Sequence, residues 1–261
     1  MSLKEDFESH GWIHIKQFFN ADQLKQLRGG VKKSLEDKIN SDLLCNPYLV
    51  SQSILNKRLV NVISSILDDM PIYFGDSSIS SNDAKMSLHK DNPDRTSASA
   101  PDWRTPYTIV RAGIYLQDYT LNSGGLILRD GSHNIASRWK GKILNPAIKP
   151  GDLVIWSLRT THSGGARRLK IAPNMAINPY IIKHLPDVFF TPRHNERTAL
   201  FVSFGKNDHH LSRYIKYLKT RSYAVQRWRK MDITQETIEA AKDVGLSILD
   251  LSKEARGLAD Q

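Results

Sequence analysis

The chain has 261 residues, of which 40% are hydrophobic and 25% are charged, so it is long enough and apolar enough to fold around a sizeable core. Its 37 Lys and Arg exceed its 27 Asp and Glu, and the net charge of +10 favours an anionic partner without naming one. Cys45 is the only cysteine, which excludes an internal disulfide framework and any multi-cysteine zinc or iron–sulfur site.

The N-terminal segment, residues 1–69, opens with acidic residues where a secretory signal needs an apolar run. No stretch of the chain reaches the roughly 18 apolar residues of a membrane span, and we therefore expect a cytoplasmic protein. A strand is expected around Trp12, Ile13 and Ile15. Asn20 followed by Gln23 is typical of a helix start, and a helix from about residue 21 to 38 would carry an apolar face.

The central segment, residues 70–205, consists of short apolar runs separated by turns. The runs are MPIYF, KMSLH, YTIVRAGIYL, GLILR, DLVIW, MAINPYII and TALFVSF. Several short strands at such intervals predict an antiparallel β-sandwich or barrel. We therefore expect one α+β domain over residues 1–261, with a β core between helical ends.

The C-terminal segment, residues 206–261, returns to helical spacing, with an apolar stripe at Leu211, Tyr214, Ile215 and Leu218. Residues 206–230 carry eight Lys or Arg against one Asp, with aromatic residues between them. The favoured interpretation is a helix whose stripe packs on the core and whose charges face water. The same pattern also fits peripheral contact with an anionic membrane surface, whereas no recognised motif supports nucleic acid.

The residues with a chemical signature begin at His89 and Asp91. Residues i and i+2 of a strand project from one face, so these two side chains would point together, as neighbouring ligands of one metal do. The triplet alone is weak, because chance produces such triplets in a chain of this composition.

Two downstream stretches, NSGGLILRDGSHN and PGDLVIWSLRTTHSGG, strengthen it. Each has a glycine turn, a short strand and a histidine at its far end, and His162 closes the second. Two histidines and one carboxylate on one face of an octahedron form the triad of non-haem iron(II) oxygenases, which leaves positions open for cosubstrate and oxygen. We predict that His89, Asp91 and His162 hold a metal.

The order H-x-D, NSGGL…GSH and PGDLVIW…HSG resembles the phytanoyl-CoA dioxygenase family of Fe(II)/2-oxoglutarate-dependent oxygenases, and so does the opening GWIHIKQFFNADQLKQLR. The resemblance covers roughly residues 5–205. It implies a double-stranded β-helix (jelly-roll) core, Fe(II), 2-oxoglutarate and O2 as cofactors, and hydroxylation of a C–H bond. Relatives that halogenate have a small residue in place of the carboxylate, so Asp91 favours hydroxylation.

The resemblance also implies an arginine, on a strand after the last metal ligand, that grips the distal carboxylate of 2-oxoglutarate. Arg197, at the start of RTALFVSFG, is the candidate, and Arg167 and Arg168 are the alternatives. The spacing departs from the family, since residues 163–196 form an insertion between histidine and arginine. His133, in the GSH turn, is interpreted as structural.

Strand alternation suggests further residues of the site. Lys85 and Ser87 would share the face of His89, and Arg111 and Tyr115 would do likewise on the next long strand. Lys85 and Arg111 are therefore candidates for binding an anionic cosubstrate. The alternative for Lys85 is that it lies at an exposed end of the strand. Trp156 is expected in the core, and the second H-x-carboxylate pair at His194 is attributed to chance.

The function predicted from the sequence is hydroxylation of a small anionic metabolite, sugar or lipid-linked substrate. The alternative is a non-catalytic or differently metallated barrel that binds an anionic ligand through Lys85, Arg111 and the basic tail. An oxygenase acting on nucleic acid ranks third. The sequence leaves the substrate-binding residues unknown.

Overall fold

The computed structural model describes residues 2–39, 41–81, 87–193 and 198–258, and these residues form two β-sheets with helices around them. The large sheet has the order β1-β6-β3-β8-β2-β9, and the small sheet has the order β5-β4-β7. The strands are β1 (Trp12–Ile15), β2 (Ile72–Ser81), β3 (Ile109–Tyr115), β4 (Gly125–Asp130), β5 (Lys142–Leu144), β6 (Leu153–Ser157), β7 (His162–Ala166), β8 (Thr198–Gly205) and β9 (Ser247–Ile248). All paired strands are antiparallel except β2 and β9.

The two sheets pack face to face, and alternation along each strand decides which side chains lie between them. On β6, Val154 and Trp156 join a core cluster with Leu126 and Leu128 of β4, whereas the intervening Ile155 faces the helices. Gly113 on β3 permits this packing, because a Cβ there would lie 2.9 Å from the Trp156 ring. The expectation that Trp156 belongs to the core is confirmed.

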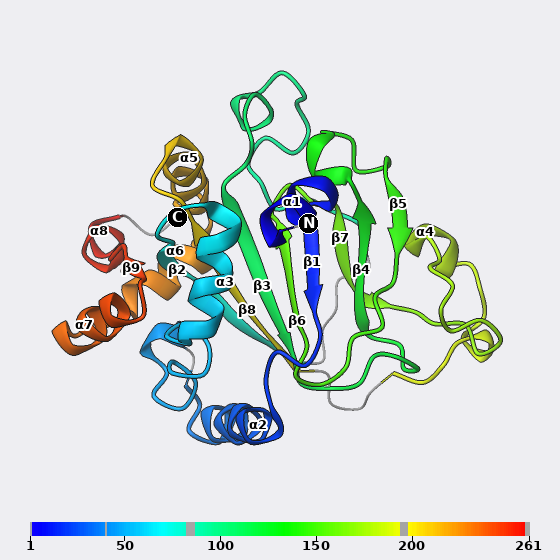
Figure 1. Cartoon of the computed structure of the whole chain (residues 1–261), viewed down its shortest axis with the longest axis horizontal. Helices are drawn as coiled ribbons and strands as arrows, with labels where there is room; N and C mark the ends of the chain where they lie inside the picture. The colour runs from blue at the N-terminus through cyan, green and yellow to red at the C-terminus, as the bar shows by residue number, and fades with distance from the viewer. Residues whose placement is uncertain (1, 40, 82–86, 194–197, 259–261) are drawn as a thin grey trace.

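Most of the helices cover the outer face of the large sheet (Figure 1). They are α1 (Leu3–His10), α2 (Ala21–Glu36), α3 (Lys57–Leu67), α5 (His209–Leu218), α6 (Ser222–Arg229), α7 (Gln235–Asp243) and α8 (Ser252–Gly257). The α2 helix begins with the capping box of Asn20 and Gln23 that the sequence indicates. The sequence interpretation did not include α1 or α3. The architecture is thus mixed, with a core rich in sheet, in agreement with the expected α+β class.

Sheet strands also come from outside residues 70–205. Strand β1 pairs with β6, from Trp12 opposite Trp156 to Ile15 opposite Leu153, and β9 pairs with β2. The N-terminal and C-terminal segments therefore contribute to the large sheet as well as to its helical cover.

Two apolar runs that were expected to form strands do not. In the run KMSLH, the described part is an isolated bridge between His89 and His162 rather than a regular strand. The run MAINPYII is a loop followed by the short helix α4 (Pro179–Ile182), because Asn178 caps the helix and Pro179 occupies its first turn. Short apolar runs do not by themselves distinguish strand from loop or helix.

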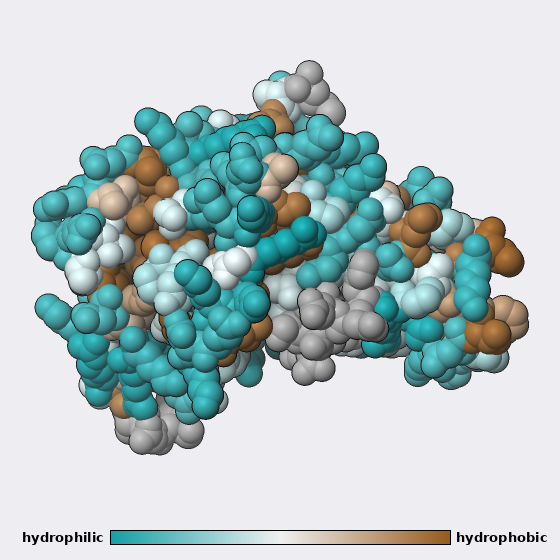
Figure 2. Space-filling model, turned by 90° about the horizontal axis from the view of Figure 1, so that it is seen from below, coloured by the Kyte–Doolittle hydropathy of each residue, from teal (hydrophilic) through white to brown (hydrophobic). Residues whose placement is uncertain are grey.

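The stretch 167–193 forms a lobe at the side of the small sheet (Figure 1) with a small core of its own, around Ile177, Ile182 and Phe190. Figure 2 shows hydrophobic surface on this lobe, at the right-hand end of the view. Its exposed large apolar side chains are Ile171, Met175, Ile181, Val188 and Phe189.

In the C-terminal segment, the stripe Leu211, Tyr214, Ile215 and Leu218 is buried in the main core, as its spacing predicts. Several basic residues there pair with carboxylates: Arg213 pairs with Asp94 and Asp102 of a loop, and Arg227 Nη1 lies 3.3 Å from Asp76 Oδ1 on β2. Among the described residues, no helix is long and apolar enough to cross a membrane.

Candidate metal centre

The structure brings His89, Asp91 and His162 together, as the sequence predicts. His89 Nε2 lies 3.6 Å from Asp91 Oδ1, and His162 Nε2 lies 3.5 Å from Asp91 Oδ2. Each of the three residues offers one potential ligand atom, and these three atoms all lie within 4.8 Å of one another. These separations are too long for hydrogen bonds and suit three donors around one ion.

A backbone bridge holds the two histidines side by side. His89 N donates to His162 O at 3.0 Å, and His162 N donates to His89 O at 2.9 Å. Asp91 N donates to Leu158 O at 2.9 Å, which fixes the carboxylate between the two rings. The segment therefore keeps His89 and Asp91 on one side without the regular strand that the sequence argument assumed.

Both imidazoles are held in the tautomer that a metal requires. His89 Nδ1 lies 2.8 Å from Ser87 O, and His162 Nδ1 lies 3.0 Å from Thr160 O. A carbonyl oxygen only accepts, so each Nδ1 carries the hydrogen and each Nε2 presents a lone pair toward Asp91. Ser87, which was expected beside the metal by strand parity, thus contributes its carbonyl.

The charge states also suit a metal. Burial lowers the pKa of His162 to about 4, which keeps the ring neutral and able to coordinate. Burial alone would raise the pKa of Asp91, but the Arg111 guanidinium and the neighbouring histidines lower it below its ordinary value. The site opens to solvent on the His89 side, where that side chain is 34% exposed against 7% for His162.

Arg111 lies directly behind the carboxylate on the inner face of β3. Its Nη1 is 2.6 Å from Asp91 Oδ2, its Nη2 is 2.9 Å from Asp76 Oδ2, and its Nε donates to Ser203 Oγ at 3.0 Å. The guanidinium is thus engaged by protein carboxylates on two sides. That it also contacts a cosubstrate stays a prediction.

Asp76 is a residue of the site that the sequence did not reveal. It follows a bulge in β2, where the register with β8 shifts between Tyr73 and Ser77. Gly75 permits the bulge, because it adopts a φ of +74° and a Cβ there would lie 2.7 Å from the Trp228 ring. A bulge re-aims the side chain beside it, and the turn of Asp76 toward Arg111 is invisible to a simple alternation of residues.

The arginine alternatives differ in what holds them. Arg167 Nη2 pairs with Asp187 at 2.8 Å, and Arg168 is fully buried, with Nη1 donating to Pro173 O and Nη2 to Pro146 O. Both are therefore committed to the 167–193 lobe. Arg197, Lys85 and His194 lie outside the described residues.

Two other residues singled out in the sequence lie away from the three ligand atoms. His133 donates from Nε2 to Glu8 O at 3.0 Å, and its ring packs so close to Gly11 that a Cβ there would lie 2.2 Å from Nδ1. This contact gives His133 a structural place, since it fixes the α1–β1 turn on the loop after β4. Tyr115 is buried between the sheets, in edge-to-face contact with Phe201.

Solved structures share this fold. The non-heme alpha ketoglutarate-dependent epimerase SnoN from nogalamycin biosynthesis has a TM-score of 0.55 at 14% identity, over 77% of this chain and 80% of its own. EctD from S. alaskensis, solved with 2-oxoglutarate and 5-hydroxyectoine, has 0.56 at 15%, over 77% and 74%. The alpha ketoglutarate-dependent carbocyclase SnoK from nogalamycin biosynthesis has 0.54 at 16%, over 81% and 89%.

No model of a known protein family matches the sequence, and no curated protein matches it significantly. What the chain shares with the solved structures is therefore the fold. This is the fold of non-haem, 2-oxoglutarate-dependent enzymes, and the His–Asp–His site lies within it. The neighbours' names include an epimerase, a carbocyclase and a monooxygenase, so the fold alone does not select the reaction.

Proposed function

We propose that this chain is an Fe(II)- and 2-oxoglutarate-dependent dioxygenase, as the likeness to the phytanoyl-CoA dioxygenase family implies. The observation that carries the proposal is the cluster of His89, Asp91 and His162, in which both Nδ1 atoms are bonded to carbonyl oxygens and both Nε2 atoms face one carboxylate. The order of the strands supports a double-stranded β-helix core, with β6-β3-β8-β2 in one sheet and β5-β4-β7 in the other, extended by the His89 bridge.

Iron(II), with 2-oxoglutarate and O2, would supply an oxidant able to remove hydrogen from an unactivated C–H bond. The protein's own contribution is to hold three ligands on one side and leave the other side open. Asp91 stays ionised because Arg111 balances its charge, and His162 stays neutral because it is buried. A carboxylate at this position leaves no room for a halide, so hydroxylation is the reaction that we propose.

Arg197 remains our candidate for binding the distal carboxylate of 2-oxoglutarate. On β8, the odd-numbered Ala199, Phe201 and Ser203 face the inside, toward β3 and β6, whereas Leu200 and Val202 join the outer core. Arg197 has the same parity as the inner residues in the sequence. Lys85 is the second cationic candidate, from the residues that precede His89.

For the substrate we propose a small anionic metabolite, sugar or lipid-linked molecule. The support is the net charge of +10, which attracts anions but does not choose among them. The lobe of residues 167–193 borders the small sheet and is the part of the chain in which we expect substrate selectivity.

The first test is release of succinate from 2-oxoglutarate under anaerobic loading with iron(II) followed by addition of O2. Asp91→Ala and His162→Ala should bind iron(II) at least ~100-fold more weakly, because even loss of a residue that only orients a ligand costs about 10- to 100-fold. His184→Ala, at an exposed histidine of the lobe, is the matched control and should behave as wild type. Wild-type iron affinity in Asp91→Ala would overturn the metal site. Iron binding without succinate release would favour the alternative of a non-catalytic barrel.

The second test concerns the cosubstrate. Removing one side of a buried charged pair costs about 2–5 kcal/mol, so Arg197→Ala should raise the 2-oxoglutarate requirement by roughly thirty-fold or more and leave iron affinity nearly unchanged. Arg197→Lys should recover part of the loss, because an ammonium keeps the charge without the fork. Arg167→Ala and Arg168→Ala are the controls. A steep loss in either of these, with normal behaviour of Arg197→Ala, would move the anchor to the lobe.

A further inference from the structure

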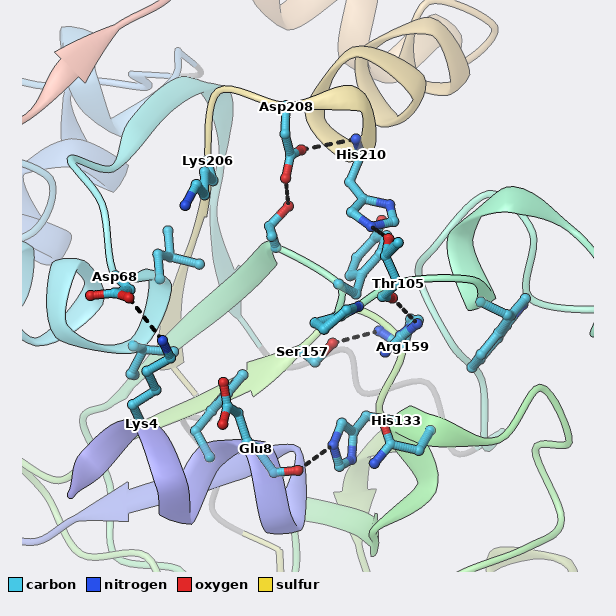
Figure 3. Close-up of a pocket in the computed structure, with 18 of the residues that line it drawn as sticks. Lys4, Glu8, Asp68, Thr105, His133, Ser157, Arg159, Lys206, Asp208 and His210 are labelled. Atoms are coloured by element: carbon cyan, nitrogen blue, oxygen red, sulfur yellow. Dashed lines mark hydrogen bonds and ion pairs between the residues drawn. The ribbon is translucent and has the colours of Figure 1, made fainter. Parts of the chain in front are cut away.

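A cavity of about 760 Å³ lies between α1, the C-terminal end of α3, the loop 103–108 and the N-terminal end of α5. In Figure 3, Lys4 and Glu8 rise from α1 on one side, and His210, Thr105 and Arg159 line the other. The lining residues include none of His89, Asp91 and His162, so this is a different space from the metal centre.

Arg159 is the feature of its wall that calls for explanation. The residue is only 4% exposed, and its Nη1 donates to Asp102 O at 2.6 Å and to Thr105 O at 3.2 Å. Its Nε is buried and has no hydrogen-bond partner among the residues that the structure describes. Within the part of the chain that the structure describes, no carboxylate lies within 4.0 Å of this guanidinium.

A second buried cation accompanies it. Lys90 is 3% exposed, and its Nζ donates to Ser132 O at 2.6 Å and to Arg159 O at 2.5 Å, again without a carboxylate among the described residues. Both cations lie over the ring of Trp103, with Lys90 Nζ at 5.4 Å and the Arg159 guanidinium carbon at 5.0 Å from its centroid. Two basic side chains thus share one aromatic ring.

The acidic residues nearby are already engaged elsewhere. The Asp102 carboxylate accepts from Asn92 Nδ2 at 2.9 Å and pairs with Arg213. Asp68 pairs with Lys4 at 2.9 Å, and Asp208 caps α5 through its bonds to backbone N–H groups. Glu8 is exposed on α1, where water screens its charge. Arg159 therefore has no carboxylate in contact with it among the described residues, and the charge of Asp102 acts on it only from a longer distance.

Burial of a charge without a partner is costly, and carbonyl oxygens compensate only part of the cost. The cost is visible in the pKa of Arg159, which burial lowers to about 10. An anion in the cavity would restore the missing balance, and a guanidinium accepts carboxylate or phosphate in two parallel hydrogen bonds. Phe7, Trp103 and Tyr107 add apolar wall, and the volume is in the range of small-molecule sites.

We propose that this cavity is a second binding site, separate from the metal centre, for a small organic molecule that carries an oxyanion, with the anionic group against Arg159 and the carbon skeleton against Trp103. The site adjoins the metal-binding segment, since Arg159 precedes His162 by three residues and Lys90 lies between His89 and Asp91. Its occupation is independent of iron and of the reaction proposed above.

The test uses the whole protein labelled with 5-fluorotryptophan, which gives one ¹⁹F signal for each of the five tryptophans. Trp103→Phe identifies the Trp103 signal. Inorganic phosphate and benzoate are titrated separately at constant ionic strength, without metal. We expect a saturable shift of the Trp103 signal with at least one probe, and the probe that binds more tightly identifies phosphate or carboxylate as the preferred group.

Arg159→Gln should weaken that binding about thirty-fold or more, the lower end for removing one partner of a buried charged pair. Arg159→Lys keeps the charge, guards against a folding defect and should bind between the two. Arg28→Gln is the matched control, since Arg28 also donates to a carbonyl, that of Leu116, but lies outside the cavity. Asp91→Ala should bind the probes as wild type does. No saturable shift with either probe, or a shift that both Arg159 variants retain in full, overturns the proposal.

Discussion

Two largely buried arginines, Arg111 and Arg159, have very different surroundings for the same charged group. Arg111 lies between the carboxylates of Asp91 and Asp76, at 2.6 and 2.9 Å. Among the described residues, the Arg159 guanidinium donates hydrogen bonds to the carbonyls of Asp102 and Thr105 and to no carboxylate. The pKa values follow these surroundings: burial lowers both, but the two carboxylates raise that of Arg111 above its ordinary value, whereas the pKa of Arg159 falls to about 10.

The comparison distinguishes a buried charge that is paired within the folded protein from one for which we propose a ligand as the partner. Around Arg111 the protein itself supplies the negative charges that neutralise the guanidinium. One of them, the Asp91 carboxylate, also faces the two histidines. Around Arg159 the protein supplies a cation, aromatic walls and space, but no carboxylate in contact with the guanidinium among the described residues. Local charge balance is therefore as informative about a ligand as the shape of a cavity.

The largest expected effect is on stability. Arg111→Met would leave the buried Asp91 without its arginine and Asp76 with Arg227 alone, which should lower the free energy of unfolding by about 3–5 kcal/mol. Arg159→Met removes two hydrogen bonds but also an unbalanced charge, and we expect a change below about 2 kcal/mol. Urea unfolding of the metal-free protein at pH 7 measures both. Equal losses would mean that Arg159 is as much a part of the protein's own balance as Arg111.

Features of this arrangement that depend on neighbouring residues could be predicted from the sequence, whereas features that depend on residues far apart in the chain could not. His89, Asp91 and His162 were found because their spacing and the glycine turns around them are local signals. The α2 helix was predicted correctly because its capping residues and its apolar face are formed by residues close together in the sequence. Asp76 was missed because a bulge breaks the alternation on which side-chain direction was judged.

Lys90 and Arg159 illustrate what no local pattern shows. Alternation places Lys90 opposite the candidate metal ligands His89 and Asp91, but its burial depends on carbonyls 42 and 69 residues away. Arg159 occupies the turn between β6 and β7, where an arginine is ordinarily hydrated, and it is buried against residues 102–107, which lie more than 50 positions earlier in the sequence. No pattern in the sequence predicts a second cavity.

A smaller effect would sharpen the role of Asp76 in the balanced pair. Asp76→Asn removes one of the two charges that hold Arg111, so Arg111 should shift and Asp91 should be less well oriented. We expect iron(II) affinity to fall about 10-fold, as for other residues that orient a metal ligand indirectly. Asp76→Glu should recover part of it, while Asp69→Asn, at an exposed carboxylate paired with Lys206, should change nothing. Wild-type affinity in Asp76→Asn would show that Arg111 needs only one carboxylate.

The smallest expected effect is on the pKa of His133, which lies near the basic side chains of Arg159 and Lys90. Burial, together with the charges of Arg159 and Lys90, lowers the pKa of this histidine to about 4, so the folded state binds its proton less readily than the unfolded chain does. Its contribution to stability is therefore present above about pH 6.5 and is lost as the pH falls toward 4. Arg159→Met removes one repelling charge and should raise the pKa of His133, by less than about one unit, which NMR titration of the imidazole measures. Arg111→Met should leave it unchanged. If both variants shift it equally, or neither does, the positive charge at Arg159 is already balanced, and the contrast between the two arginines disappears.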